Sequence, residues 1–152
     1  MAIIIGSDHQ GYPLKESIKR HFRALGSEVF DRGCHGIVPA DYPEHGARVA
    51  RDVAAGLGKG ILICATGIGM SMVANKFPGI RAALCRNELD AERSRQHMDA
   101  NIICLSGMIT PLEVAIRLVD RFLREPFQGD EECHQRRVNQ IENLLMDNSL
   151  MS

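Results

Sequence analysis

Residues 60–71 read Gly60-Ile61-Leu62-Ile63-Cys64-Ala65-Thr66-Gly67-Ile68-Gly69-Met70-Ser71, an apolar run followed by a glycine-rich turn. A strand that is apolar at every position is typical of a parallel sheet, because helices cover both of its faces. The glycines after the run predict a sharp turn into a short helix, at about residues 71–76. A strand, a turn and a helix in this order form the repeating unit of α/β proteins.

The same unit recurs along the chain. Short apolar runs predict four further strands, at residues 2–5, 27–30, 80–84 and 101–105. Apolar residues at helical spacing predict the helices that follow, at about residues 14–25, 43–57, 87–96 and 110–122. Strands that alternate with helices predict one five-stranded parallel sheet with right-handed crossovers and helices on both faces. The expected fold is a doubly wound, Rossmann-like α/β/α sandwich.

Local signals refine two of these helices. Asn87 is expected to cap the helix that follows it, and residues 110–113, Thr-Pro-Leu-Glu, predict a capping box. On the second helix, the face expected to be buried carries Ala50, Val53, Ala54 and Leu57.

An additional helix is expected at the end of the chain, at about residues 134–145. Its residues Val138, Ile141 and Leu145 form an apolar stripe. Because five helices already cover the sheet, we expect this stripe to pack on a partner subunit of a homo-oligomer; the alternative is that it folds back on its own domain. Residues 1–152 are expected to form a single domain, since domains average roughly 150 residues.

Composition excludes several classes of protein. Eighteen Lys and Arg balance nineteen Asp and Glu, and Trp is absent, so we expect no nucleic-acid partner. No apolar run approaches the roughly 20 residues that span a bilayer, so no membrane partner is expected. The N-terminus lacks the positive segment of a signal peptide. Five widely spaced cysteines without a C-x-x-C pair favour reduced thiols in a cytoplasmic protein.

Ligands of an open parallel sheet bind beyond the carboxyl ends of its strands. The first strand is followed by Asp8 and His9 between two glycines, which let the backbone turn closely around a ligand. Asp8 is an equally good candidate for a residue that only caps this turn. Asp41 follows the second strand, and its alternative role is to start a helix.

The turn after Cys64 is the most informative of these segments. Backbone amides of a glycine-rich turn before a helix form an anion site, and their partial positive charge favours a thiolate at Cys64. The dinucleotide fingerprint G-x-G-x-x-G is not present, since its third glycine falls at Met72. We therefore expect an oxyanion cradle beside a nucleophile or base; the alternative is that Cys64 is a small core residue.

Two further segments carry polar candidates. His97 ends a helix at an edge of the sheet that is not obviously the ligand-binding one, and residues 134–137, His-Gln-Arg-Arg, are either a phosphate clamp or an exposed helix start. The six histidines lack the H-x-x-x-H and H-E-x-x-H spacings, so we expect neither a metal site nor a cofactor.

Taken in order, these segments form a specific series of motifs. They are Gly6-Ser7-Asp8-His9-Gln10-Gly11 with Leu14-Lys15, Asp41-Tyr42-Pro43, residues 60–69, Ala74-Asn75-Lys76, Gly79-Ile80-Arg81-Ala82-Ala83, Ser94-Arg95-Gln96-His97 and His134-Gln135-Arg136-Arg137. Over about residues 3–141 the chain resembles the ribose-5-phosphate isomerase B family, which also includes the subunits of galactose-6-phosphate isomerase.

The resemblance implies a cofactor-free aldose–ketose isomerase that works through a cis-enediolate, with ribose 5-phosphate and ribulose 5-phosphate as the default pair. It assigns Cys64 as the base that moves a proton between C1 and C2, and Thr66 and His97 as residues that open the sugar ring. The family consists of dimers or tetramers whose sites are completed by a neighbouring subunit. The implied substrate-binding residues are Asp8, His9, Asp41, Gly67, Gly69, Ser71, His134 and Arg137.

The chain also departs from the family pattern. Met98 stands where Asn is common, Ala65 replaces a common Gly, and Met108 and Cys133 stand where many members have an Arg that reaches the phosphate. Fewer cations at the phosphate predict weak turnover of ribose 5-phosphate. The alternatives are therefore an isomerase of another sugar (a tetrose or hexose phosphate, or an unphosphorylated sugar or sugar acid) and a catalytically silent sugar-phosphate-binding subunit.

Overall fold

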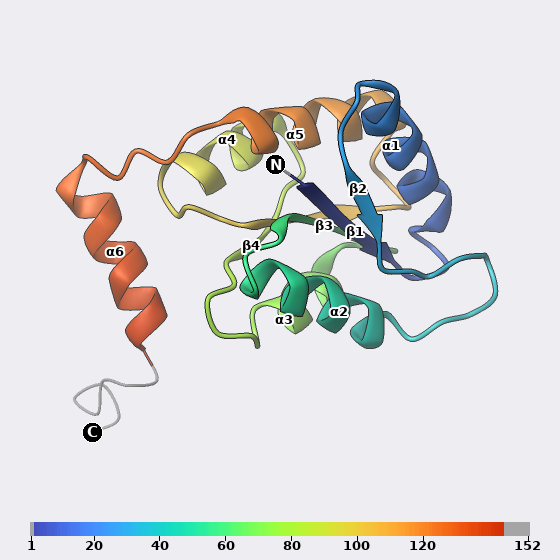
Figure 1. The fold of residues 1–152 in the computed structure, drawn as a ribbon, viewed down its shortest axis with the longest axis horizontal. Helices are drawn as coiled ribbons and strands as arrows, with labels where there is room; N and C mark the ends of the chain where they lie inside the picture. Colours follow the sequence, from blue (N-terminus) through green and yellow to red (C-terminus); the bar gives the residue numbers. More distant parts are fainter. Residues whose placement is uncertain (1, 145–152) are drawn as a thin grey trace.

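The computed structural model describes residues 2–144 and has the predicted architecture of three layers, with a sheet between two layers of helices (Figure 1). All strand pairs are parallel, which confirms the five-stranded, doubly wound sheet. The strands are β1 (Ala2–Ser7), β2 (Val29–Asp31), β3 (Gly58–Cys64), β4 (Ala82–Leu84) and β5 (Ile102–Ser106). The helices are α1 (Tyr12–Ala24), α2 (Tyr42–Ala54), α3 (Ile68–Ala74), α4 (Glu88–Gln96), α5 (Leu112–Arg124) and α6 (Glu132–Asn143).

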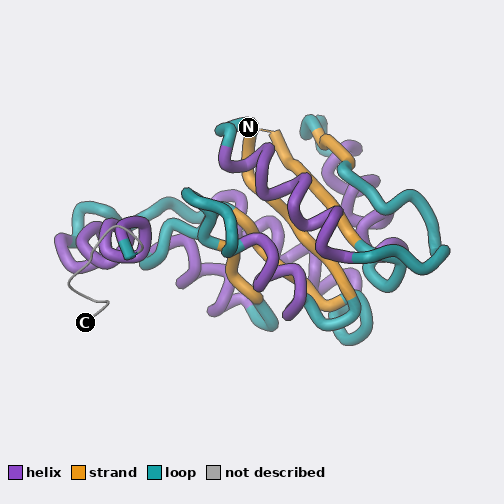
Figure 2. The backbone as a smooth tube through the Cα atoms, turned by 90° about the horizontal axis from the view of Figure 1, so that it is seen from below, coloured by secondary structure: helices purple, strands orange, loops and turns teal. Residues whose placement is uncertain are grey.

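The central strand is β3, and its sequence explains the layers. Ile61 and Ile63 point into the core under α1, α4 and α5, whereas Leu62 and Cys64 point into the core under α2 and α3. Because both faces of the strand are covered, every position in its second half is buried. Figure 2 shows the strands side by side between the two layers of helices.

The strand order, β2-β1-β3-β5-β4, decides where a ligand is expected. From β1 the chain winds outward to β2 and then crosses to the other side of β1 to form β3. The neighbouring strands β1 and β3 therefore flank the topological switch point, where crossovers lead away in opposite directions. Ser7 pairs with Ile63 at this point, so the segments after both strands meet at one edge.

Several expected helix boundaries are wrong, each for a local reason. The helix after β3 begins at Ile68 rather than near Ser71, because Gly67 already makes the turn in a left-handed conformation. The residue before α5 is Pro111 rather than Thr110, and no side chain caps this helix, so the predicted capping box does not form. Asn87 does cap α4 as predicted, accepting a hydrogen bond from the Asp90 amide at 2.9 Å.

The buried face of α2 is also displaced from the expected one. This helix ends at Ala54, so Leu57 lies beyond it and is exposed, as is Ala54 itself. The residues that α2 buries against β1, β3 and α3 are Gly46, Val49, Ala50 and Val53.

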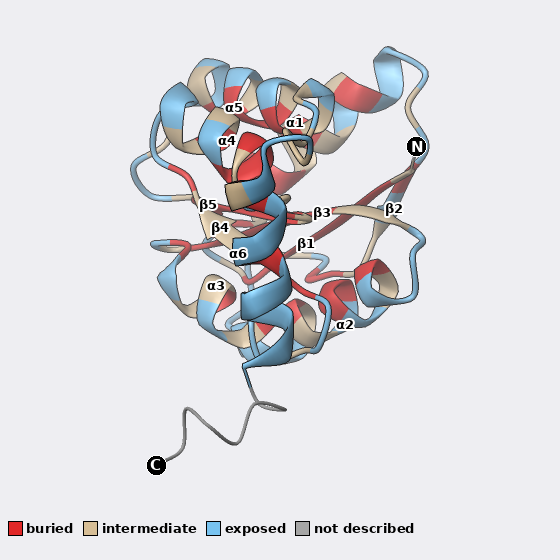
Figure 3. Cartoon of the chain, turned by 90° about the vertical axis from the view of Figure 1, so that its left-hand side faces the viewer, coloured by how far each residue is buried: buried red, intermediate tan, exposed pale blue. Residues whose placement is uncertain are grey.

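The helix α6 stands apart from the sandwich, beside the edge of the sheet that β4 forms (Figures 1 and 3). It buries only His134 and Val138, and Ile141 is about half exposed. Leu145, the last residue of the expected apolar stripe, lies outside the described residues. Packing of this helix on a partner subunit stays a prediction. No helix among residues 2–144 has the length and apolar character that crossing a membrane requires.

A buried lysine fixes the segment that leads from β2 to the edge of the sheet. Lys15 of α1 is fully buried, and its ammonium donates to both carboxylate oxygens of Asp31 at 2.7 and 2.8 Å and to the carbonyl of Cys34 at 2.6 Å. Burial alone raises the pKa of Asp31, but hydrogen bonds from Lys15, Lys19 and the Gly33 amide outweigh it and lower this pKa to about 2. The segment after β2 is therefore anchored by an ion pair.

Candidate active site

The turn after β3 places a thiol beside a backbone donor. Gly67 has φ of +78°, and its N–H donates to the Cys64 sulfur at 3.2 Å. A side chain at Gly67 would lie 2.9 Å from the carbonyl oxygen of Leu105, so only glycine fits this turn. The turn is held against the end of β5 by the Gly107 amide, which donates to the Cys64 carbonyl at 2.8 Å, and by the Ser106 hydroxyl, which donates to the Ala65 carbonyl at 2.6 Å.

Three other predicted residues lie on the same turn or on the first turns of α3. Thr66 is exposed and accepts a hydrogen bond from the Ile68 amide at 3.3 Å, while the Ser71 hydroxyl donates to the Ile68 carbonyl at 2.8 Å. Gly69 lies in the first turn of α3, where backbone amides have no partner within the helix. A side chain at Gly69 would meet the ring of Tyr42 at 2.7 Å, so this aromatic ring packs directly over the turn.

The segment after β1 brings two more predicted residues to this edge. Asp8 is buried and accepts a hydrogen bond from the Gly11 amide at 2.9 Å, so it does cap the turn. The Nδ1 atom of His9 accepts a hydrogen bond from the Ala40 amide at 3.1 Å. A neutral His9 therefore carries its proton on Nε2, where it is available to a ligand oxygen.

Asp41 is exposed at the start of α2. It occupies the position before the helix, yet its side chain makes no capping hydrogen bond. Asp41 therefore stands at a helix start, as the alternative role has it, but its carboxylate makes no capping hydrogen bond and is open to solvent.

The remaining predicted residues form a second group. His97 ends α4 and its ring stacks on that of His134 in α6, with centroids 4.3 Å apart and planes at 26°. The Nε2 atom of His97 lies 3.1 Å from the Arg93 guanidinium. Partial burial, His134, Arg93 and Arg137 lower the pKa of His97, and Glu131 opposes them. This group combines a histidine that favours its neutral form with cations suited to a phosphate.

One chain does not bring the two groups together. Cys64 pairs with the last residue of β5, Ser106, whereas His97 precedes the first, Ile102. Ser106 lies four residues beyond Ile102 along β5. The first group is therefore at the carboxyl ends of the strands and the second at their amino ends, at least about 13 Å apart along the strand. Within the described residues, the candidate site is divided between the two ends of the sheet.

Burial separates the cysteines by chemistry. All five are free thiols. Burial raises the pKa of Cys85 to about 12 and raises that of Cys104 well above its ordinary value, so both behave as core residues. Cys64 is also buried among apolar side chains, but its sulfur receives an amide hydrogen bond at the ligand-binding edge. Cys64 therefore lies both in the core and at the edge of the sheet where a ligand is expected.

Among residues 2–144, one group of side chains has the atom types and spacing of possible metal ligands. The ligand atoms of Glu131, Cys133 and His134 lie within 4.8 Å of one another. They lie at the start of α6, where the positive end of the helix and the cations around His97 disfavour a further cation. We therefore assign this set no metal.

Sequence reasoning missed two residues that shape these groups. Tyr42 was seen only as part of a motif, and nothing local indicates that its ring covers Gly69. Arg93 precedes His97 by four residues, a spacing that puts both on one helix face and could have identified it.

The fold and the first group define a doubly wound α/β protein with a thiol and an amide-lined turn at its switch point. A family model described as Ribose/Galactose Isomerase matches residues 3–141. Ribose-5-phosphate isomerase B of Escherichia coli (strain K12) is 42% identical over 140 residues, which cover 91% of this chain and 93% of that protein. The chain belongs to the Ribose/Galactose Isomerase family.

Solved structures agree with this assignment. Ribose-5-phosphate isomerase B of Clostridium thermocellum superposes with a TM-score of 0.92 at 46% identity, covering 96% of this chain and 98% of that one. The Mycoplasma genitalium ribose-5-phosphate isomerase B structure, which has ribulose-5-phosphate bound, gives a TM-score of 0.89 at 38% identity, with coverages of 96% and 97%.

We predict that Gly67→Ala destabilises the protein by about 1–3 kcal/mol more than Gly26→Ala does, because the backbone of Leu105 must move. Gly26 is the matched control, since its φ of +81° is similar but a side chain there meets nothing within 4 Å. Urea unfolding of both variants at one protein concentration measures the difference. Equal losses would show that the turn tolerates a side chain at position 67.

Proposed function

We propose that this chain is a cofactor-free aldose–ketose isomerase of sugar phosphates that interconverts D-ribose 5-phosphate and D-ribulose 5-phosphate. The observation that carries the proposal is the Cys64 thiol, held at the switch point against the Gly67 amide. Family membership and the ribulose-5-phosphate in the Mycoplasma genitalium relative support the choice of substrate.

Cys64 is the base in this reaction. Its thiolate takes the proton from C2 of the open-chain aldose, and the electron pair of that C–H bond forms the C1–C2 double bond of a cis-enediolate. The electrons of the carbonyl bond move to O1. The hydroxyl proton on O2 passes to O1. Cys64 then returns its proton to C1, the electrons of the C1–C2 double bond form the new C–H bond, and the charge on O2 forms the C2 carbonyl of the ketose. No redox partner is consumed, because one carbon is oxidised as its neighbour is reduced.

Backbone amides stabilise the enediolate oxygen. The first turn of α3 offers its amides at the place where negative charge develops, and preorganised donors of this kind typically contribute about 10²–10³-fold in rate each. The Gly67 amide already donates to the Cys64 sulfur. We therefore assign this amide two partners, the thiolate of the base and the enediolate oxygen. Gly69 then supplies the second amide. Asp8, His9, Asp41 and Ser71 hold sugar oxygens around the turn.

The second group completes the site from a neighbouring subunit. His97, with Thr66, opens the sugar ring, and His134 and Arg137 hold the phosphate. A partner is required because these residues lie at the opposite edge of their own sheet. Large apolar side chains are left exposed in the segments that follow β2 and β5, and such side chains suit an interface. They are Ile37, Val38, Met108 and Ile109, which are 68–77% exposed.

Two positions favour a second candidate, an isomerase of another sugar. Met108 leaves an exposed thioether at the edge of the sheet that holds Cys64, and Cys133 directly follows Glu131 and Glu132. A silent binding subunit is the third candidate, but a protein that only binds has no use for a thiol against a turn amide. The free thiols fit a reducing compartment, and we propose the cytoplasm.

Replacing the base tests the reaction. We predict that Cys64→Ala abolishes turnover and the exchange of substrate C–H protons with deuterated water, while the fold and substrate binding persist. General-base catalysis typically contributes about 10²–10⁴-fold, and the change in side-chain volume is small. Cys104→Ala, at a fully buried thiol of β5, is the control and should keep its activity. A kcat near that of the wild type in Cys64→Ala would eliminate Cys64 as the base.

Mixing two inactive variants tests the shared site. We predict that Cys64→Ala and His97→Ala are each inactive and that co-refolding them restores about a quarter of wild-type turnover, since half of randomly formed dimers carry one intact site of two. Sedimentation at micromolar concentration should show an oligomer. A monomer, or no recovery on mixing, would contradict a site made by two subunits.

The phosphate positions give a further prediction. Cys133→Arg should raise kcat/KM for ribose 5-phosphate by about tenfold or more, because a hydrogen bond to a charged group contributes roughly 1.5–3 kcal/mol. Cys133→Ala is the control and should bring no gain. Efficient wild-type turnover that Cys133→Arg leaves unimproved would show that Arg137 or another cation already suffices.

A further inference from the structure

Arg81 lies in a conspicuous sequence motif but takes no part in the proposed reaction. Arg81 is the residue just before β4, and its side chain is only 15% exposed. The Arg81 amide donates to the side-chain oxygen of Asn101 at 2.9 Å, and the Asn101 amide group donates to the Gly79 carbonyl at 2.7 Å. The residue is thus fixed at both its backbone and its side chain.

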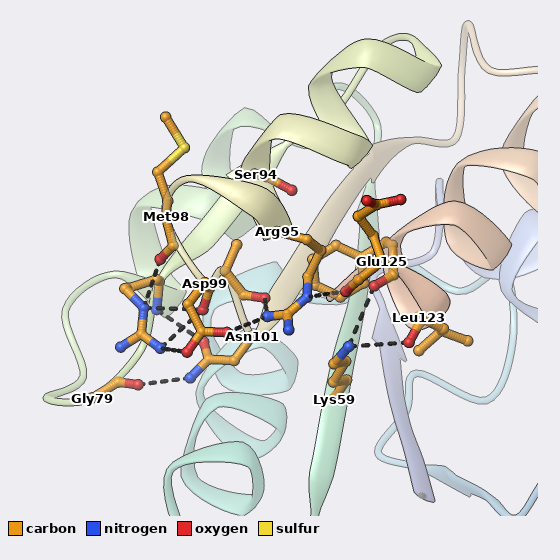
Figure 4. A network of polar contacts seen from close by, with 12 residues as sticks. Lys59, Gly79, Ser94, Arg95, Met98, Asp99, Asn101, Leu123 and Glu125 are labelled. Atoms are coloured by element: carbon orange, nitrogen blue, oxygen red, sulfur yellow. Dashed lines mark hydrogen bonds and ion pairs between the residues drawn. The ribbon is translucent and has the colours of Figure 1, made fainter. Parts of the chain in front are cut away.

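On one side, Arg81 holds the turn that follows His97. Its Nε donates to the carbonyls of Met98 and Asp99, each at 3.0 Å, and its Nη2 donates to the Asp99 carboxylate at 3.1 Å. Asp99 has a φ of +46°, a conformation that side chains other than glycine rarely adopt. Its other carboxylate oxygen accepts from the buried Arg95 at 2.7 Å (Figure 4). Arg81 and Arg95 therefore stabilise the strained turn at Asp99, two residues after His97.

On its other side, Arg81 holds α6. Its Nη1 forms an ion pair with Glu142, two turns of helix beyond His134. Next to this pair, Ile141 and Met98 line a hollow of about 260 Å³ together with Ile80 and Ala83. The start of α6 has a separate tie, since the Gln128 amide donates to the Gln96 carbonyl at 3.0 Å. Because α6 otherwise stands clear of the sandwich (Figure 1), few contacts set its angle.

We propose that Arg81 is a positioning residue that locks the His97 turn and α6 into one arrangement, so that His97 and the phosphate-binding residues of α6 meet the same substrate. The inference rests on the proposed function, in which His97 opens the ring and α6 holds the phosphate. The side-chain polar contacts of Arg81 are with Met98, Asp99 and Glu142, not with His97 or with the phosphate-binding residues His134 and Arg137. It acts through Asp99 on the first and through Glu142 on the second.

The contact of Arg81 with Asp99 should affect kcat, and its contact with Glu142 should affect KM. Asp99→Asn removes the charge but keeps the shape, and Asn tolerates the left-handed conformation. It should lower kcat by about tenfold or more and leave KM nearly unchanged, since small displacements of a catalytic group are costly. Glu142→Gln should raise KM by about three- to fivefold at unchanged kcat, the scale of one partly exposed ion pair. Arg81→Lys, which loses the planar fork, should do both.

The experiment measures kcat and KM for ribose 5-phosphate in these three variants, with Glu88→Gln as the control. Glu88 also forms an ion pair with an arginine, Arg117, but this pair links α4 to α5 on the outer surface. Thermal unfolding identifies any variant that has simply lost stability. The proposal is supported if Asp99→Asn lowers kcat alone and Glu142→Gln raises KM alone. It is overturned if each variant changes both parameters equally, or if both variants give the values of Glu88→Gln.

A second measurement keeps the inference separate from the proposed function. Proton NMR of the histidine rings reports the stacking of His97 on His134 without any substrate. Arg81→Lys and Glu142→Gln should shift these ring signals, whereas Glu88→Gln should not. If the wild type turns over no sugar phosphate, the proposed function fails, and the ring signals still decide whether Arg81 positions the pair. Unchanged ring signals in Arg81→Lys would overturn the inference.

Discussion

The close packing of the turn after β3 against the end of β5 is the constraint on which the candidate chemistry depends. Hydrogen bonds from Ser106 and Gly107 to the Ala65 and Cys64 carbonyls leave no space beside Gly67 for a side chain. Glycine at this position adopts the left-handed conformation and lets the turn lie close to β5, and the Gly67 amide in this turn donates to the Cys64 sulfur. The same turn starts α3, so one local requirement provides the thiol's partner, the amides and the helix together.

The parts of this arrangement that local sequence encodes were predictable. The apolar run of β3, the glycines after it and the cap at Asn87 each express a short-range rule, and together they predict the sheet and the position of Cys64. What failed depended on neighbours. Thr110 begins no capping box because α5 starts one residue later, after Pro111, and the buried face of α2 follows the packing of Val49 rather than that of Leu57. The stacking of His97 on His134 joins segments 37 residues apart in sequence, and the spacing of neither residue indicates it.

The division of the site between two edges follows from topology. In a parallel sheet each helix returns the chain to the opposite edge, so a residue that ends a helix cannot lie beside one that ends a strand of the same sheet. The sequence places Cys64 at a strand end and His97 at a helix end. In the proposed enzyme, a second copy of the chain, rather than a rearrangement of one, unites them. In this arrangement α6 carries residues to the partner's site, so its position must be fixed although it buries only His134 and Val138.

The buried ion pair under the loop after β2 has a consequence for how this protein responds to acid. The pKa of Asp31 is about 2 in the folded chain and 3.8 ordinarily, so the pair's contribution is complete above about pH 4 and is lost as the pH falls towards 2. The pKa of Lys19 is raised, because its ion pairs with Asp31 and Glu16 outweigh partial burial, so the lysine stays charged well into the alkaline range. The ion pair that anchors the start of the loop leading to Ala40 and Asp41 therefore keeps its charges from about pH 4 well into the alkaline range.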